Sequence, residues 1–201
     1  MREVLIAYHD KCIDGFTSAW VTQRECESKG YDVGLLPMDY TEASYHNLID
    51  RMEAIPMHIL YVVDFSLPMD VLRTLGKNHP NMRIMILDHH KTAFENYAPE
   101  HEVTSTSKFR RVLFNNVTAI LDNSRSGAGI CWDYFNPQTI APAIVRYVQD
   151  YDLWKFEYGE DTKAINMYLN FKPRTVISWD AIHFALADGV LFNAALSLGY
   201  E

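Results

Sequence analysis

The stretch that most restricts the fold of this chain is a short apolar run that stops at Asp88-His89-His90. The run covers residues 82–87 and is interrupted only by Arg83, so it is too short for an ordinary helix and suits a buried strand of a parallel sheet. The acid and the two imidazoles then fall at the carboxyl end of the strand. Open α/β sheets bind ligands at that edge, so we predict that this strand delivers chemically active side chains.

The same arrangement recurs along the first half of the chain. One predicted strand ends at His9 and another ends at Asp64. Predicted strands alternate with predicted helices, which indicates a parallel sheet with right-handed crossovers. The strands are expected at residues 3–8, 31–38, 58–63 and 82–87, and the helices at 16–28, 42–53 and 68–78, with Ser66 as the N-cap of the last helix. The predicted fold class is α/β, a Rossmann-like parallel sheet flanked by helices.

The second half is less regular. Residues 94–110 resemble a surface connection, and residues 111–121 are rich enough in β-branched side chains for one or two further strands. A turn of small residues at 124–129 precedes a predicted helix at 130–135, whose N-terminus is suited to an anion. Further helices are expected at 142–149, 162–170, 176–187 and 191–198.

Composition excludes several classes of protein. The chain has 201 residues with 48% hydrophobic residues, which argues against general disorder. No apolar stretch approaches the roughly 20 residues that span a bilayer, and three separated cysteines predict neither a disulfide framework nor a zinc finger. A net charge of −8 gives no general attraction for long nucleic acid. We expect a cytoplasmic protein without a signal peptide.

Together the ends of the predicted elements supply a set of imidazoles and carboxylates. They are His9, Asp14, Asp64, Asp88, His89, His90, Asp150 and Asp152. Mixed ligands of this kind suit intermediate divalent ions such as Mn²⁺ rather than the thiolate sites of structural zinc. Two such ions roughly 3.5–4 Å apart can activate water and neutralise phosphoryl oxygens, so the set predicts phosphate ester hydrolysis.

The order of these motifs resembles the DHH phosphoesterase superfamily, and within it the oligoribonuclease-like (nanoRNase) branch. The motifs that carry the resemblance are residues 9–16 (HDKCIDGF), 63–66 (VDFS), 88–93 (DHHKTA), 126–128 (SGA) with 132–135, and 150–154 (DYDLW). They extend over about residues 3–156. Five motifs in the family's order are more specific than any one of them.

The resemblance implies roles for individual residues. The metal ligands would be His9, Cys12, Asp14, Asp64, His89 and Asp150, with Asp10 and Asp152 as alternatives. Asp64 would bridge the two ions, His90 would face the scissile phosphate, and Asp88 would orient His89. We assign substrate binding to Lys91, Arg125, Ser126 and Gly127, since Arg in particular suits bidentate contacts with phosphate.

The chain departs from the superfamily at two points. In the first motif Cys12 stands where the family usually has an acid, so three interpretations stay open: Cys12 ligates as a thiolate, Asp10 replaces it, or the first ion binds weakly. A small buried thiol is the structural alternative. The second departure is that nothing after Trp154 matches the family's glycine- and histidine-rich second domain. We therefore predict a DHH domain at residues 1–156 and a short helical C-terminal extension at 157–201 that packs on it.

The sequence thus predicts a metal-dependent phosphohydrolase that cleaves phosphodiester or phosphomonoester bonds in short oligonucleotides or small nucleotides through a dimetal-activated water. The expected cofactors are two divalent ions, Mn²⁺ with Mg²⁺ or Co²⁺ as alternatives. Two other functions stay open: a pyrophosphatase-like hydrolase of phosphoanhydrides, and a catalytically weak protein that binds a nucleotide or a partner. The expected substrate partner is a small nucleotide or short single strand, without long duplex nucleic acid or membrane, and self-association through residues 191–198 is a further option.

Overall fold

The computed structural model describes residues 2–100, 102–104, 106–114, 116–188, 192–193 and 196–198. In this part of the chain the strands form one six-stranded sheet in the order β2-β1-β3-β4-β6-β5. The strands are β1 (Arg2–His9), β2 (Tyr31–Met38), β3 (Ile59–Val63), β4 (Arg83–Asp88), β5 (Lys108–Phe114) and β6 (Val117–Asp122). All neighbouring pairs are parallel except β5 with β6, which is an antiparallel pair at the edge. The predicted α/β fold class is confirmed.

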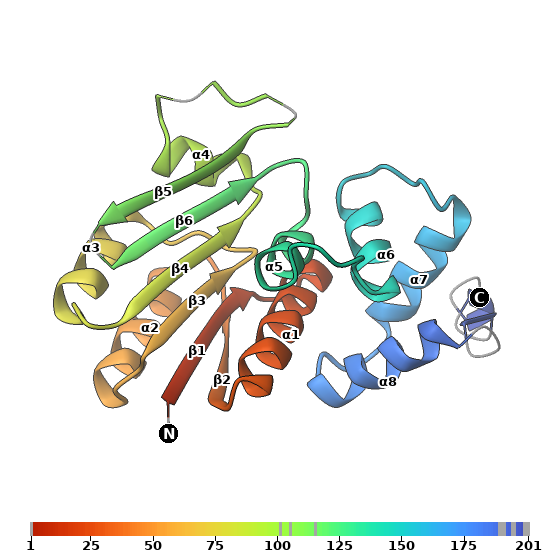
Figure 1. The fold of residues 1–201 in the computed structure, drawn as a ribbon, viewed down its shortest axis with the longest axis horizontal. Coiled ribbons are helices and arrows are strands. Elements are labelled where there is room, and N and C mark those ends of the chain that lie inside the picture. Colours follow the sequence, from red (N-terminus) through yellow and green to blue (C-terminus); the bar gives the residue numbers. More distant parts are fainter. Residues whose placement is uncertain are drawn as a thin grey trace.

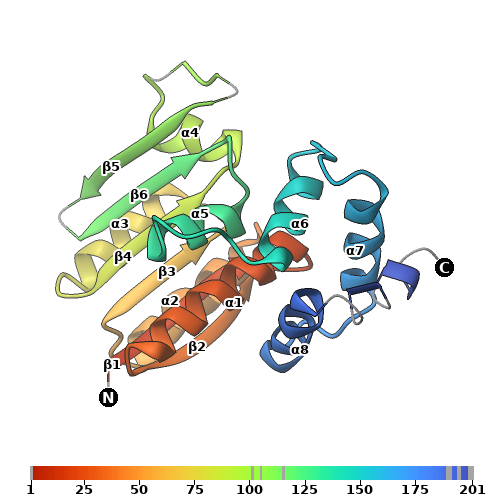
Figure 2. The ribbon, with the colours of Figure 1, turned by 45° about the vertical axis from the view of Figure 1, so that its right-hand side comes forward.

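Helices cover both faces of the sheet, as Figures 1 and 2 show. The helices are α1 (Ile13–Ser28), α2 (Glu42–Ala54), α3 (Met69–Asn78), α4 (Lys91–Tyr97), α5 (Gly127–Phe135), α6 (Ala143–Asp152), α7 (Glu160–Asn170) and α8 (Val176–Ala187). One face carries α2, α3 and α4, whereas α1 and α5 lie on the other face (Figure 1). The helices α6, α7 and α8 stand together beside α1 (Figure 2).

The sheet has an apolar core on each face. In β1, Val4 and Ile6 pack with α1, α5 and the helices beyond them, whereas Leu5 and Ala7 pack with α2, α3 and α4. Successive side chains of a strand point to opposite faces, so a strand buried on both faces needs apolar residues at almost every position. This requirement explains why β1, β3 and β4 are continuous apolar runs in the sequence.

The C-terminal helices share the core on the α1 face. Trp179 of α8 is fully buried, and its indole Nε1 donates a hydrogen bond of 3.0 Å to Thr17 Oγ1 of α1. Ile165 of α7 belongs to the same core. Residues beyond 156 therefore pack against α1 and α6, while a domain boundary at 156/157 stays a prediction. The helix expected at 191–198 lies partly outside the described residues.

Two local expectations were wrong. Residues 94–110 were expected to be a surface connection, but their beginning belongs to α4, where the rings of Phe94 and Tyr97 are buried against the sheet. Ser66 was expected to cap α3, yet the N-cap is Pro68, because the hydroxyl of Ser66 donates instead to the carboxylate of Asp88. A helix of seven residues without a capping side chain, such as α4, has little signal in a sequence.

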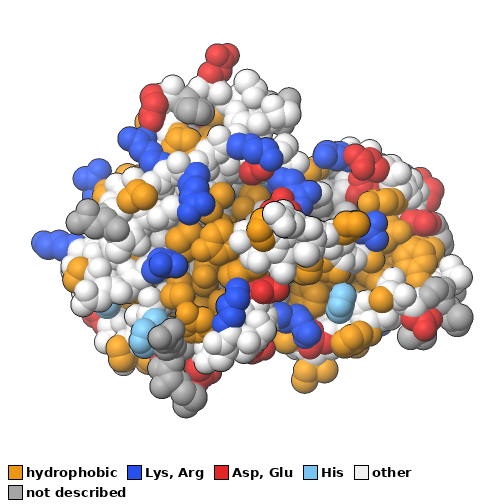
Figure 3. Space-filling model, in the orientation of Figure 1, with side chains coloured by type: hydrophobic (Ala, Val, Ile, Leu, Met, Phe, Trp, Pro, Cys, Tyr) orange, Lys and Arg blue, Asp and Glu red, His pale blue; other side chains and the backbone are white. Residues whose placement is uncertain are grey.

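The sheet face that carries α5 is only partly covered. Figure 3 shows hydrophobic side chains gathered in a hollow in the middle of this face, bordered by Lys and Arg. A cavity between β5, β6 and α5 is lined there by Arg110, Ile120, Ile130 and Tyr134, among others. None of the described helices combines the length and the hydropathy that crossing a bilayer requires.

Candidate metal centre

The predicted ligands gather at the carboxyl edge of the three central strands. In the sheet order β1, β3 and β4 are neighbours, so His9 at the end of β1, Asp64 just after β3 and His89 just after β4 lie side by side. The backbone N–H of Asp64 donates to the carbonyl of Leu87 at 2.9 Å, and Asp64 adopts a φ of 50°. This left-handed conformation turns the chain sharply at the strand end and aims the carboxylate across the edge.

Asp64 and His89 lie at the centre of the group. His89 Nε2 is 3.1 Å from Asp64 Oδ1, 3.8 Å from Asp14 Oδ2 and 3.6 Å from Asp152 Oδ2. On the other side, His9 Nδ1 is 3.7 Å from Asp64 Oδ2. The donor atoms form overlapping sets that could each hold a metal ion. They are His9, Cys12 and Asp64; Asp14, His89 and Asp152; and Asp64, Asp88, His89 and His90, in each of which the atoms lie within 4.8 Å of one another.

Several buried atoms in this group lack a hydrogen bond. Both carboxylate oxygens of Asp64, Nδ1 of His9 and Oδ2 of Asp152 are buried without a hydrogen-bonding partner of good geometry among the described residues. An unsatisfied buried polar atom costs about 1–3 kcal/mol, and a charged one costs more. Four such atoms at one place fit a group that is completed by a cation, so the donor set matches a divalent metal ion.

The pKa shifts reflect the same excess of negative charge. Burial lowers the pKa of His89, but contact with Asp64 and the charges of Asp14 and Asp152 outweigh it and raise the pKa to about 10. Burial raises the pKa of Asp14 well above its usual value, and the charge of Asp64 raises it further. For Asp64 the imidazoles of His89 and His9 overcome the effect of burial and lower the pKa. The imidazolium of His89 therefore does part of what a metal ion would do here.

The N-terminus of α5 was predicted to suit an anion, and in the structure it binds the carboxylate of Asp14. The backbone N–H groups of Gly127 and Ala128 donate to the two carboxylate oxygens of Asp14 at 2.6 and 3.0 Å. Ser126 is fully buried, and its hydroxyl accepts from the N–H of Gly129. The polar groups of Ser126 and Gly127 face the protein, and their assignment to substrate binding stays a prediction.

Glycine is required at two close approaches beside Asp14. A Cβ on Gly127 would stand 2.6 Å from Asp64 Cβ and 2.9 Å from Ser18 Oγ, and a Cβ on Gly15 would collide with the carbonyl of His9. These contacts let α5 and α1 press directly against the strand ends. The glycines thus set the distance between Asp14 and Asp64.

Asp88 orients His90, whereas the sequence analysis expected it to orient His89. Oδ1 of Asp88 is 2.7 Å from Nδ1 of His90 and accepts from the backbone N–H of His89 at 2.7 Å. The other oxygen accepts from Ser66. Asp88 is completely buried, so these contacts hold the imidazole of His90 in one orientation at the rim of the donor set.

The structure places Asp152 with the metal donors and Asp150 away from them, which corrects the preferred assignment of Asp150. Helix α6 runs to Asp152, so the two acids point about 160° apart around its axis. The carboxylate of Asp150 accepts hydrogen bonds from the N–H groups of Glu157 and Tyr158 at 2.9 and 3.2 Å and from Thr162 Oγ1. Asp150 therefore fastens the turn between α6 and α7.

Three other predicted residues have different positions. Cys12 is partly buried as the N-cap of α1, and its Sγ is one of the donors beside His9; burial and the charge of Asp64 raise the pKa of the thiol. Asp10 belongs to none of the donor sets found among the described residues. Lys91 is 77% exposed and lies 3.5 Å from Glu95. Whether Cys12 ligates a metal stays a prediction.

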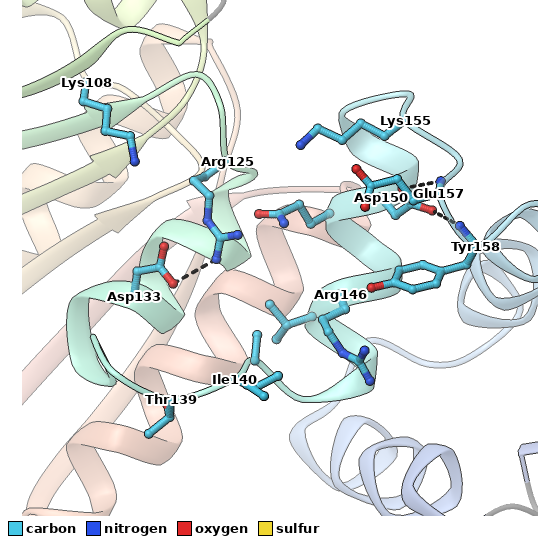
Figure 4. A pocket seen from close by; sticks show the side chains of 13 residues that line it. Lys108, Arg125, Asp133, Thr139, Ile140, Arg146, Asp150, Lys155, Glu157 and Tyr158 are labelled. Carbon is cyan, nitrogen blue, oxygen red and sulfur yellow. Dashed lines mark hydrogen bonds and ion pairs between the residues drawn. The ribbon is translucent and has the colours of Figure 1, made fainter.

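Arg125 lies in a separate cavity of about 520 Å³ between α5 and α6 (Figure 4). Its guanidinium donates to Asp133 Oδ1 at 2.8 Å. The cavity is also lined by Lys108, Arg146 and Lys155 and by the misassigned Asp150. Apart from Asp150 it is lined by none of the predicted metal ligands. Arg125 pairs with Asp133 of the same cavity, whereas Lys108 pairs with Asp122 and Arg146 lies over the ring of Tyr158.

Sequence reasoning missed Tyr40, which follows β2 and lies beside the donors. The rings of Tyr40 and His9 are 5.6 Å apart. A lone tyrosine between a strand and a helix has no distinguishing pattern. Its position after a predicted parallel strand could have identified it, because the residues just after β2 lie at the same edge of the sheet as those after β1.

Comparison with known proteins gives relatives of the fold. No family model matches the chain. It is 24% identical over 169 residues to uncharacterized protein R106 of Acanthamoeba polyphaga mimivirus, and the match covers 82% of this chain and 36% of that protein. A crystal structure of an uncharacterized protein from Helicobacter pylori G27 superposes with a TM-score of 0.68 and 15% identity over 100% of this chain and 61% of that one. The chain thus spans about a third of the viral protein and about three fifths of the bacterial one.

A weaker match is a crystal structure of the exonuclease RecJ bound to manganese. Its TM-score is 0.45 with 16% identity, and the match covers 92% of this chain and 42% of that chain. A TM-score at this level carries no argument about function. The H. pylori structure supports the α/β fold.

Proposed function

We propose that this chain is a divalent-metal-dependent phosphohydrolase of the DHH type. The observation that carries the proposal is the group of eight donors at one sheet edge, of which we assign six to metal ions: His9, Cys12, Asp14, Asp64, His89 and Asp152. Buried carboxylate oxygens normally take part in a hydrogen bond of good geometry, whereas both oxygens of Asp64 lack one and lie 3.1 Å from His89 Nε2 and 3.7 Å from His9 Nδ1. When bound, a pair of divalent ions lowers the pKa of water and neutralises the charge of a phosphoryl group.

The donors divide into two groups that share Asp64 as a neighbour. His9 and Cys12 would hold one ion, and Asp14, His89 and Asp152 the other, with Asp64 between them. Imidazole and carboxylate ligands favour Mn²⁺, with Mg²⁺ or Co²⁺ as alternatives. The pKa shifts of Asp14 and Asp152 support this, because two acids whose charged forms are disfavoured by their surroundings would regain them beside a cation.

The chain's own residues supply the rest of the chemistry. His90 lies beside the donors, and Asp88 fixes its ring, so it can donate a hydrogen bond or a proton to an oxygen of the phosphate. In a protein with a net charge of −8, this site would favour a phosphorylated ligand once divalent cations are bound there. We propose a small nucleotide or a short single-stranded oligonucleotide as the substrate, and a cytoplasmic location.

The test is hydrolysis of bis-p-nitrophenyl phosphate beside RNA and DNA of two to five nucleotides, with Mn²⁺, Mg²⁺ or a chelator. We expect Mn²⁺-dependent cleavage by the wild type and its loss in His89→Ala. His58→Ala is the matched control, because His58 is exposed at the opposite edge of the sheet, where it accepts from the N–H of Glu3. No turnover with any metal, or equal activity in both variants, would refute the proposal.

A further inference from the structure

Two hollows border the metal centre at different ends. One is lined by Lys11, Asp14, Asp152 and Asn166 among others, has a volume of about 270 Å³ and contacts the donors from the α1 and α6 side. The other has a volume of about 600 Å³ and is bordered by His9 and His90. We call the second one the Tyr40 cavity; it lies between the β2–α2 turn, the β3–α3 segment and α4.

The Tyr40 cavity has a largely aromatic and apolar wall. Tyr40, Tyr45 and Met69 line it. The ring of Tyr40 packs on Phe65 at a centroid distance of 4.5 Å and an angle of 31°, and it remains 53% exposed. A large aromatic ring that is supported on one side and half open to solvent beside a reactive centre is suited to stack on a flat ligand.

The position of Tyr40 is held by its neighbours. The N–H of Thr41 donates to Asp39 Oδ1 at 3.1 Å, and the N–H of Asp39 donates to Ser44 Oγ at 3.1 Å. Thr41 also caps α2 by accepting from the N–H of Ser44. The turn that presents the ring is therefore ordered before any ligand binds, which reduces the entropy lost on binding.

The opposite wall supplies polar groups without charge. Thr92 and Asn96 are four residues apart on α4, so they lie on one face of that helix, and both line the cavity. Among the described residues that line it there is no Lys, Arg, Asp or Glu. Away from the imidazoles of His9 and His90 at the metal centre, a phosphate would find no cation in this cavity, whereas an uncharged ring with hydrogen-bonding edges finds both a stacking surface and polar partners.

From this contrast we infer that the Tyr40 cavity binds the nucleobase, or an equivalent flat uncharged ring, of the nucleotide whose phosphate lies at the metal centre. The inference rests on the proposed function and adds to it the side on which the base lies, next to His9 and His90. The polar hollow beside Lys11 and Asn166 is left for the charged or sugar part of the substrate.

The test compares the 5′-phosphorylated dinucleotide pApA with two versions that each lack one of its bases. In Tyr40→Ala we expect KM for pApA to rise about 5- to 150-fold, the range of one base–aromatic stack, with kcat and Mn²⁺ affinity little changed. Tyr40→Phe keeps the ring and should behave like the wild type. Phe184→Ala, which removes another exposed ring, from α8, is the control.

The abasic substrates make the result specific. One of them should lose its sensitivity to Tyr40→Ala, because the group that would stack is already missing. Asn96→Trp, which fills the cavity from the opposite wall, should raise KM for pApA as well and serves if Tyr40→Ala does not fold. Equal KM changes for all three substrates, or none, would overturn the inference alone. No turnover by the wild type would overturn the proposed function and this inference with it.

Discussion

Replacing Asp152 and Asp150 separately by asparagine tests the metal centre most directly. The two acids are two residues apart on α6, yet only Asp152 has an oxygen within 3.6 Å of His89 Nε2. Loss of a residue that merely supports a ligand typically costs 10–100-fold in metal affinity. Loss of a ligand should cost at least as much, so we expect Asp152→Asn to weaken Mn²⁺ binding about 100-fold or more.

The matched variant Asp150→Asn should act on stability instead. The carboxylate of Asp150 accepts three hydrogen bonds with two oxygens, and an amide keeps only one acceptor. A hydrogen bond to a charged group contributes about 1.5–3 kcal/mol, so the free energy of unfolding should fall by about that amount while Mn²⁺ affinity stays within a few-fold.

Calorimetric titration with Mn²⁺ and urea unfolding of the chelated protein measure the two effects independently. We expect Asp152→Asn to lose Mn²⁺ affinity and Asp150→Asn to lose stability. If Asp150→Asn lost as much Mn²⁺ affinity as Asp152→Asn, the reasoning that separates Asp152 from Asp150 would be refuted. The result would then favour Asp150 as a metal ligand, as the sequence analysis expected.

Three further outcomes follow from the geometry. His90→Ala should lower kcat about 100-fold or more but lower Mn²⁺ affinity less than His89→Ala does, because Nδ1 of His90 is engaged by Asp88 Oδ1 at 2.7 Å. Steady-state kinetics and titration check both effects. In the chelated protein, the raised pKa of His89 contributes stability that is complete below about pH 6.5 and lost as pH rises to about 10, so Tm should fall over that range and the fall should be smaller in His89→Gln. Gly127→Ala should lower the free energy of unfolding, measured with urea, by about 1–3 kcal/mol and weaken Mn²⁺ binding, because the new Cβ would stand 2.6 Å from Asp64 Cβ. Gly34→Ala is the control, because its Cβ would meet nothing closer than 3.4 Å, and it should not affect Mn²⁺ binding.

Much of the fold could be predicted from the sequence because the signals are local. Apolar runs that end at His9, Asp64 and Asp88 mark the strands of a sheet buried on both faces. Their carboxyl ends must meet at one edge when the strands are parallel and adjacent. The sequence by itself therefore determined the α/β class and most of the donor set.

The rest depended on distances and directions that only the packed chain defines. The phase of α6 decided between Asp150 and Asp152, and that phase follows from which side of the helix packs on the core. Packing of α5 on α1 decided that its N-terminus binds Asp14. The place of Tyr40 beside His9 depended on β2 being the neighbour of β1. The order of the motifs in the sequence shows which residue types are available. The geometry of the ligands depends on contacts between segments that are far apart in sequence, and those contacts exist only in the tertiary structure.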